Sequence, residues 1–310
     1  MSARLKRLAS RLLAIYGAGL PYHPGKWRVV EKVVDTFRLQ SLHTDAQMVS
    51  RQGLRFALDT RCGIDRWIYY LGVYERADTQ LMLRMLQPGW VVLDVGANIG
   101  WYTLMAAKAL AGTGAVHAFE PAPEEFARLS QNLALNGFRN VTLHEQALSD
   151  SAGQGLLTEL RDAGMTRLAT STDSSSRPVS MNTLDLFARA TALGRLDFVK
   201  VDIEGAELRF LQGGRSTLAR LRPTLMIELH EQNLAAFGTT PELLVRELEQ
   251  MDYRLYRTTR KGLEAFHAPH PRSTLMNVIA LPTELAAARR LSWPALEATA
   301  ARHAGVVRAS

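Results

Sequence analysis

Apolar runs alternate with segments of helical periodicity over residues 76–282. The apolar runs are WVVLDVG, GAVHAFEP, NVTLHEQALSD, LDFVKVDIEG and PTLMIELH. Amphipathic segments lie between them, such as PEEFARLSQNLALNG, and TTPELLVRELEQM with Thr240 as the expected N-cap. Strands that alternate with helices of this length are typical of parallel βαβ units. We therefore expect a doubly wound, mostly parallel α/β sheet.

The segments at the borders of this region predict further elements. Upstream, LRFALDT and RWIYYLG have the composition of strands around a turn at Cys62-Gly63, and GVYERADTQLMLRMLQPG predicts a helix that ends before Pro88-Gly89. AELRFLQGGRSTLARL predicts one helix. Near the end of the region, YRLYRTT and STLMNVIALP are joined by a polar loop without helical periodicity. These last two strands should pair antiparallel at one edge of the sheet.

The first twenty residues have the pattern of a short basic amphipathic helix. Leu5, Leu8, Leu12 and Ile15 fall on one face at three- and four-residue spacing. This face either packs on the rest of the protein or lies on a membrane surface. Glycines, a proline and the lack of a cleavage motif argue against a signal peptide, and no apolar stretch is long enough to span a membrane. We expect a helical and hairpin extension at 1–75, the α/β domain at 76–282 and a helical tail at 283–310.

Composition and charge narrow the function classes. The formal net charge is +7, but Arg and Lys are scattered, so no nucleic-acid partner is expected. Cys62 is the only cysteine, which excludes an intramolecular disulfide and a multi-cysteine zinc site and favours the cytoplasm. The oligomeric state is left open.

The turn after WVVLDVG carries two glycines, Gly96 and Gly100, and is preceded by Asp94. A dinucleotide loop needs G-x-G-x-x-G and would bring Asp94 against a pyrophosphate of like charge. Asp94 suits a ligand with a cationic or hydroxyl-bearing end. Glu120, twenty residues after Gly100, ends the next strand where a carboxylate can bind ribose hydroxyls. The pattern indicates S-adenosylmethionine, with a nicotinamide oxidoreductase as an alternative.

Several motifs together resemble the FkbM family of class I SAM-dependent methyltransferases. They are LDVGANIGWYTL, FEP, VKVDIEGAE and IELH, in this order, after the block GVYERADTQLMLRMLQPG. The resemblance covers residues 53–282 and implies a seven-stranded Rossmann-like sheet with an antiparallel edge strand. It implies cofactor contacts for Tyr74, Glu75, Asp94, Gly96, Asn98, Gly100, Glu120, Gln146, Ala147 and Asp202.

The resemblance also implies O-methylation of a hydroxyl on a sugar, glycan, glycolipid or related metabolite. A hydroxyl needs a general base or a metal to remove its proton, and the polar residues at strand ends are Asp202, Glu204, Glu228 and His230. Asp202, Glu228 and His230 are the candidate catalytic residues. Asp202 and Glu228 could also hold Mg²⁺, although no metal is expected.

Other interpretations of the same residues are left open. A nucleic-acid methyltransferase is the main alternative, although DIEGAE replaces the Asn/Asp-Pro-Pro-aromatic motif of amino-methylating DNA enzymes, and Cys62 lies in no suitable motif for cytosine carbon methylation. A binding protein that has lost catalysis is another alternative. Lys200 could pair with Asp202 or Glu204 in a purely structural role. His117 and His144 lie inside strands, so we expect them to be packed rather than catalytic.

Overall fold

The computed structural model describes residues 2–21, 23, 25–43, 47–159, 166–169, 176–259, 262–266 and 275–288. The serine-rich stretch 170–175 and the tail 289–310 lie outside these ranges. The chain divides into two compact units, with the first boundary between Arg76 and Ala77; residues 130–137 also belong to the first unit. None of the described helices is both long and apolar enough to cross a membrane.

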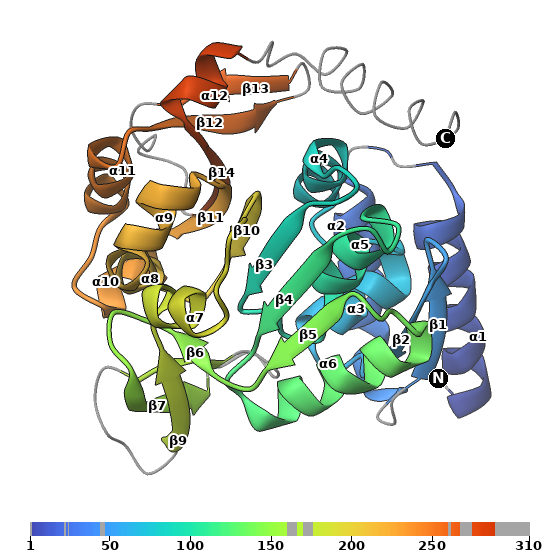
Figure 1. The fold of residues 1–310 in the computed structure, drawn as a ribbon. Coiled ribbons are helices and arrows are strands. Elements are labelled where there is room, and N and C mark those ends of the chain that lie inside the picture. The colour runs from blue at the N-terminus through green and yellow to red at the C-terminus, as the bar shows by residue number, and fades with distance from the viewer. Residues whose placement is uncertain are drawn as a thin grey trace. The chain divides into compact units, whose positions relative to one another are not determined.

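The first unit is built from helices and a β-hairpin (Figure 1). Its elements are α1 (Ala3–Ala14), the π-helix η1 (Ile15–Gly19), α2 (Lys26–Phe37), the 3-10 helix η2 (Leu39–Ser41), β1 (Gln47–Arg51), β2 (Leu54–Leu58) and α3 (Gly63–Leu71). The turn of the hairpin is at Gln52-Gly53, where both residues have positive φ.

The prediction of a strand for RWIYYLG is wrong, because this segment lies in α3. Its aromatic composition favours a strand, but tertiary contacts override the propensity. Asp65, Ile68 and Tyr69 are buried at helical spacing. The Asp59 amide donates to Asp65 Oδ2 at 2.5 Å, and Gly72, with φ 75°, ends the helix by donating its N–H to the Ile68 carbonyl.

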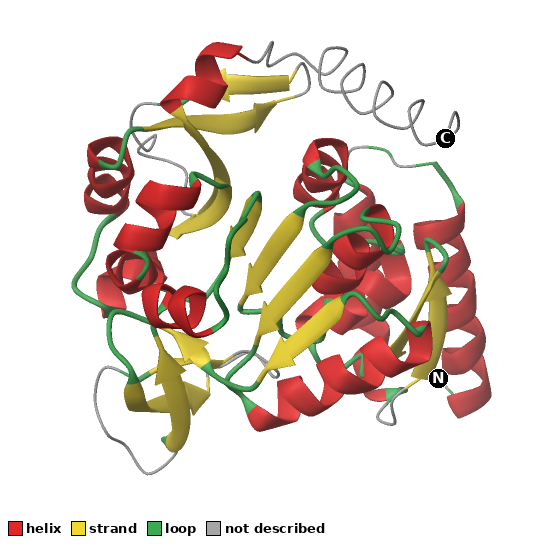
Figure 2. Cartoon of the chain, viewed as in Figure 1, coloured by secondary structure: helices red, strands yellow, loops and turns green. Residues whose placement is uncertain are grey.

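The second unit contains the expected α/β sheet, in which the described residues form eight strands rather than seven. Their order is β13-β12-β14-β11-β10-β3-β4-β5, and β11, β10, β3, β4 and β5 pair in parallel (Figures 1 and 2). The bounds are β3 (Val91–Val95), β4 (Ala115–Phe119), β5 (Val141–His144), β10 (Phe198–Val201), β11 (Thr224–His230), β12 (Tyr253–Thr259), β13 (Gly262–Ala265) and β14 (Leu275–Pro282). The antiparallel pairing of β12 with β14 is confirmed, and β13 is the added edge strand.

The third expected strand, NVTLHEQALSD, is divided between two sheets. β5 ends at His144, and β6 (Ala147–Leu148) joins a separate sheet of order β6-β9-β7-β8. The remaining strands of that sheet are β7 (Gly153–Glu159), β8 (Thr166–Leu168) and β9 (Arg177–Asn182). The division follows packing, because Ala147 is buried in a cluster with Leu157 and Val179 of the smaller sheet.

Helices accompany the strands of the second unit. They are α4 (Arg76–Met85), α5 (Trp101–Ala109), α6 (Pro123–Asn136), α7 (Leu184–Ala190), α8 (Glu207–Gly213), α9 (Arg215–Leu221), α10 (Glu231–Ala236), α11 (Pro241–Gln250) and α12 (Thr283–Ala288). The second half of α6, from Ser130 on, belongs to the first unit. Thr240 caps α11 as predicted, accepting the Leu243 amide at 3.3 Å. The single helix predicted for AELRFLQGGRSTLARL is divided at Gly214 into α8 and α9. At Gly213, where α8 ends, a Cβ would lie 1.9 Å from the Ser149 carbonyl oxygen.

The central strands have two chemically different faces, because successive residues of a strand point to opposite sides. We call one the apolar face: it comprises Leu93, Val95, His117, Phe119, Val199, Val201, Ile227 and Leu229, and most of these residues belong to the core shared with α7, α8, α9 and α11. We call the other the polar face: it carries Asp94, Lys200 and Glu228 at the alternate positions. Lys200 lies directly beside Asp94 in the strand register.

Candidate functional site

The glycine turn after β3 has backbone reasons for both of its glycines. Gly96 has φ 84°, and a Cβ there would lie 1.8 Å from the Asp202 carbonyl oxygen. Gly100 has φ 92°, and its Cβ would lie 2.6 Å from Leu129 Cδ1. The turn therefore packs directly against the end of β10. This packing requires the glycines irrespective of the ligand, so their role at a cofactor stays a prediction.

Asp94 is buried beside this turn, on the polar face. The Thr103 hydroxyl of α5 donates to its Oδ2 at 2.5 Å, which ties β3 to the helix after the turn. Burial raises the pKa of Asp94 to about 6, against the opposing effects of Thr103 and Lys200. One carboxylate oxygen is thus engaged within the protein, and a contact of Asp94 with the cofactor stays a prediction.

Glu120 follows β4 and joins two loops through its carboxylate. Its Oε2 accepts the Asn98 amide at 2.8 Å, and its Oε1 accepts the Ala122 amide at 2.9 Å. Burial raises its pKa to about 7, although both amides favour the charged form. A carboxylate offers about four acceptor positions. Glu120 therefore retains acceptor capacity beyond these two amides, and its contact with ribose hydroxyls stays a prediction.

The other predicted cofactor residues lie in different surroundings. Gln146 is half-buried between β5 and β6, and Ala147 is buried near Ala122. Tyr74 and Glu75 belong to the first unit, where the Tyr74 ring lies edge-on to Trp67. Their contacts with the cofactor stay predictions.

Asp202 directly follows β10 and is paired with a lysine. Lys200 Nζ lies 2.9 Å from Asp202 Oδ2, and the Lys200 side chain is 1% exposed whereas that of Asp202 is 20% exposed. The ammonium also lies 5.1 Å from the centre of the Tyr102 ring. Lys200 thus holds the Asp202 carboxylate in place while leaving part of it accessible.

The loop Asp202–Glu207 is held in place by its own acidic residues. Glu207 is buried, and its Oε1 accepts the Ile203 and Gly205 amides at 3.1 and 3.2 Å. A Cβ on Gly205 would lie 2.2 Å from the Asn233 carbonyl oxygen, so the loop is in close contact with α10. Glu204, with φ 55°, accepts a hydrogen bond from Asn233 Nδ2 at 2.5 Å. These contacts fix the position of the Glu204 carboxylate.

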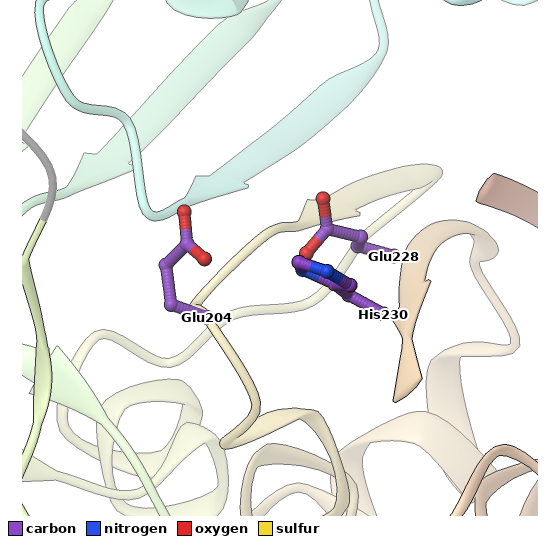
Figure 3. Close-up of side chains that lie close together, drawn as sticks. All are labelled: Glu204, Glu228 and His230. Carbon is purple, nitrogen blue, oxygen red and sulfur yellow. The ribbon is translucent and has the colours of Figure 1, made fainter. Parts of the chain in front are cut away.

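Glu204, Glu228 and His230 converge near the ends of β10 and β11 (Figure 3). One ligand atom from each lies within 4.8 Å of the other two. Burial is the main cause of the raised pKa values of Glu204 and Glu228, and the nearby Asp202 carboxylate raises both values further. Burial lowers the pKa of His230, so its imidazole is neutral at pH 7. The structure therefore brings together Glu204, Glu228 and His230, three of the four strand-end residues that the sequence singled out.

A pocket of about 900 Å³ lies between α4 and the strands β12 and β14. Polar residues predominate in its lining: Asp78, Gln80, Arg84, Arg257, Thr258, Thr259 and Asn277, with Ala77 and Met276. Asn277 is the register partner of Glu228 and donates to Asp78 Oδ2 at 3.1 Å. Asn277 Oδ1 and Thr258 Oγ1 are buried without a partner among the described residues. Apolar atoms nevertheless contribute more of the pocket surface than polar atoms do, and the two unpartnered oxygens are buried behind it.

His117 and His144 are packed, as predicted. The two rings join through nitrogens 3.2 Å apart, and His144 stacks on Phe119 at 4.5 Å between ring centres. Burial lowers the pKa of His144 to about 4, so the ring is neutral at pH 7.

Several residues that shape the site were not predicted from the sequence. Glu207 and Gly205 were visible within DIEGAE, and their acidic and glycine character was the available signal. Asp78 and Asn277 had no local signal, because α4 and β14 approach only in the folded unit.

Comparisons with known proteins identify the family of this chain. The family described as "Methyltransferase FkbM domain" matches residues 94–255. The 31-O-demethyl-FK506 methyltransferase FkbM of Streptomyces tacrolimicus is 39% identical over 107 residues, which are 34% of this chain and 40% of that protein. Methyltransferase 1 of Beauveria bassiana (strain ARSEF 2860) is 26% identical over 174 residues, covering 49% of this chain and 69% of that protein.

The crystal structure of the methyltransferase FkbM from Methylobacillus flagellatus KT is similar over 89% of this chain and 59% of that chain, with 14% identity and a TM-score of 0.40. The match spans about 40% of the length of the Streptomyces relative. The family match covers more than half of the 310 residues and includes Asp94, Glu120, Asp202 and Glu228. This chain belongs to the FkbM methyltransferase family.

Proposed function

We propose that this protein is a SAM-dependent O-methyltransferase that methylates a hydroxyl of a sugar, glycan, glycolipid or related metabolite. The observation that carries the proposal is the cluster of Glu204, Glu228 and His230, which lies at the same sheet edge as Asp202 and as a pocket whose lining residue Asn277 pairs with Glu228. Family membership supports methyl transfer. The name of the Streptomyces relative, a 31-O-demethyl-FK506 methyltransferase, supports a hydroxyl acceptor.

The cofactor residues are those at the ends of β3 and β4. Glu120 fits a nucleoside, because two backbone amides already orient its carboxylate and acceptor positions remain for ribose hydroxyls. S-adenosylmethionine, when bound, supplies a methyl group on a positively charged sulfur. The turn through Gly96 brings this end of β3 next to Asp202, so the two halves of the site are adjacent.

The protein's main task in such a transfer is to orient the hydroxyl and accept its proton. In the overall reaction the acceptor oxygen forms a bond to the methyl carbon, and the electron pair of the breaking C–S bond stays on sulfur. The hydroxyl proton goes to a side chain, for which we propose Asp202. Asp202 is more exposed than Glu228, and Lys200 fixes its carboxylate at 2.9 Å.

A two-part experiment tests this function. Calorimetry with S-adenosylhomocysteine measures cofactor binding, and labelled methyl transfer is then screened over glycans, glycolipids, nucleotide sugars, polyketides, RNA and DNA. We expect cofactor binding and label in a hydroxyl-bearing small molecule or glycan. Absence of binding at millimolar ligand contradicts the proposal. Label in RNA or DNA alone establishes the nucleic-acid alternative.

A further inference from the structure

We propose that Glu204, Glu228 and His230 form a binding site for a divalent transition-metal ion such as Mn²⁺. Two carboxylates and one imidazole are a mixed oxygen and nitrogen ligand set. Their ligand atoms lie within 4.8 Å of one another, which allows one ion to contact all three. Three protein ligands leave coordination positions open for oxygens of the acceptor, as in catalytic metal sites.

The state of Glu228 points to a ligand at this place. The residue is only 7% exposed, and its Oε2 has no hydrogen-bond partner among the described residues. The side chain extends toward the same space as His230 and Glu204 (Figure 3). A buried carboxylate oxygen without a partner is costly, and a bound cation removes that cost.

Charge balance supports a cation as this ligand. Three carboxyls, those of Asp202, Glu204 and Glu228, influence one another, whereas Lys200 is the cation offsetting them among the described residues. Lys200 is already engaged with Asp202. On binding a divalent ion, both glutamates would give up any proton, and the two carboxylates would then balance its charge.

The position of Glu204 is fixed independently of any ion. Asn233 donates to its Oε2, and the close contact of Gly205 with α10 fixes the loop that carries it. Such hydrogen bonds to a ligating carboxylate orient it for the metal. The ligand set therefore combines a fixed loop carboxylate with two residues of one strand, Glu228 and His230, which lie on the same side of β11.

The role of this metal site rests on the proposed function. In methyl transfer, the ion would bind the oxygen of the acceptor hydroxyl and make that hydroxyl more acidic. Its test is metal binding itself. Mn²⁺ is titrated into the full chain, and free Mn²⁺ is measured by electron paramagnetic resonance. We expect one ion per chain, with affinity at least about tenfold lower in Glu228→Gln and in His230→Gln. Glu249→Gln, an exposed glutamate on α11, is the matched control and should bind like the parent.

Each other outcome contradicts the site. No Mn²⁺ binding by the parent at millimolar ion, or equal binding by both variants, overturns the proposal. A repeat titration with saturating S-adenosylhomocysteine separates the ion from the cofactor, and competition between them assigns the carboxylates to the cofactor instead. If a variant's melting temperature shows that it is unfolded, Glu204→Gln replaces it. Failure of cofactor binding in the parent concerns the proposed function and is measured separately.

A second inference concerns α1, and a different observation carries it: we infer that this helix binds an anionic lipid surface. The four apolar residues predicted to share a face are exposed: Leu5 by 52%, Leu8 by 54%, Leu12 by 58% and Ile15 by 63%. The opposite side anchors the helix in the first unit. Leu13 is buried there, and the buried Ser10 hydroxyl lies 2.8 Å from the Tyr70 hydroxyl.

Charge complementarity identifies the partner. Arg4, Arg7 and Arg11 are exposed and recur at the spacing of the apolar residues, so they form a row beside them. No acidic residue occurs in the first twenty residues. An apolar stripe flanked by arginines is typical of helices that lie in the interface of an anionic membrane.

Co-sedimentation of the full chain with vesicles tests this inference. We expect binding to vesicles of phosphatidylcholine with about one-third phosphatidylserine, reduced by high salt because the arginine contribution is screened. The double variant Leu8→Glu/Leu12→Glu should lose most of the binding. The matched control Leu186→Glu/Leu243→Glu changes two exposed leucines of α7 and α11 and should retain it.

Two results overturn the lipid assignment. One is equal sedimentation of the parent and Leu8→Glu/Leu12→Glu, or of the parent with and without phosphatidylserine. The other is a parent dimer that the double variant converts to a monomer in light scattering, which assigns the stripe to a second copy of this chain.

Discussion

The two faces of the central sheet are made by the same strands but have opposite chemistry. On the apolar face, Leu93, Val199 and Ile227 are fully buried against helices. On the polar face, the neighbouring residues Asp94, Lys200 and Glu228 are also buried, but they are ionisable. Adjacent residues of one strand therefore differ in their effect on stability: the apolar side chain stabilises the fold when buried, whereas burial of the ionisable side chain costs free energy.

Histidines show the same difference between the faces. His117 and His144 lie among the Phe119 and Phe187 rings on the apolar side, and packing accounts for both. His230 lies instead beside Glu204 and Glu228. Burial keeps all three neutral at pH 7 by lowering their pKa values, but only His230 is close to acids that could act with it. The side chains around each histidine, more than its burial, therefore distinguish a packed histidine from one that could take part in catalysis.

The largest effect should come from the polar face. Asp202→Asn should lower kcat by about 10²–10⁴-fold, because an amide cannot accept the acceptor's proton but can still accept from Lys200. Affinity for S-adenosylhomocysteine should be retained. Steady-state kinetics and calorimetry measure the two quantities, and equal losses in both would assign Asp202 to the cofactor.

On the apolar face, Ile227→Ala should lower the free energy of unfolding by about 2–5 kcal/mol through the cavity it leaves. The milder Ile227→Val should cost about 0.5–1.5 kcal/mol. Urea unfolding of the full chain measures both. Cofactor affinity of the folded variants should equal that of the parent, and a selective loss of that affinity would show that the faces are not separate in function.

At the cofactor end of the sheet, Glu120→Ala should weaken S-adenosylhomocysteine binding by about 1.5–3 kcal/mol, the range for hydrogen bonds to a charged group. The control is Glu124→Ala, which removes an exposed carboxylate paired with Arg177 on the same segment. Calorimetry compares them. Unchanged binding in Glu120→Ala would place the ribose elsewhere.

Near neutral pH, the smallest effect should come from the packed histidines, as a pH dependence of stability. Burial lowers the pKa of His144 from 6.5 to about 4, so between these values the unfolded chain binds the proton more strongly than the folded one. Stability from this residue is complete above pH 6.5 and declines as pH falls toward 4. His144→Gln should flatten the decline in urea unfolding measured across this range. A parent and variant with parallel profiles would contradict this assignment.

Much of the second unit was predictable from local pattern. The strands β3, β4, β10 and β11 and the helices α4, α6 and α11 follow from periodicity, caps and glycines. The alternation in VVLDV, FVKV and TLMIELH also places Asp94, Lys200 and Glu228 on one side of the sheet. Local pattern failed for RWIYYLG, where burial of Ile68 and Tyr70 outweighs β-propensity, and for NVTLHEQALSD, whose end packs in another sheet.

The sequence alone determined the fold class, the family resemblance and the residue types at the strand ends, because these depend on neighbours along the chain. Tertiary structure decided which of these residues meet. The proximity of Glu204 to His230, the pairing of Asn277 with Asp78 and the exposure of Leu5, Leu8 and Leu12 each depend on segments distant in sequence or on what covers a face. Packing sets such distances, and local propensity contains no information about them.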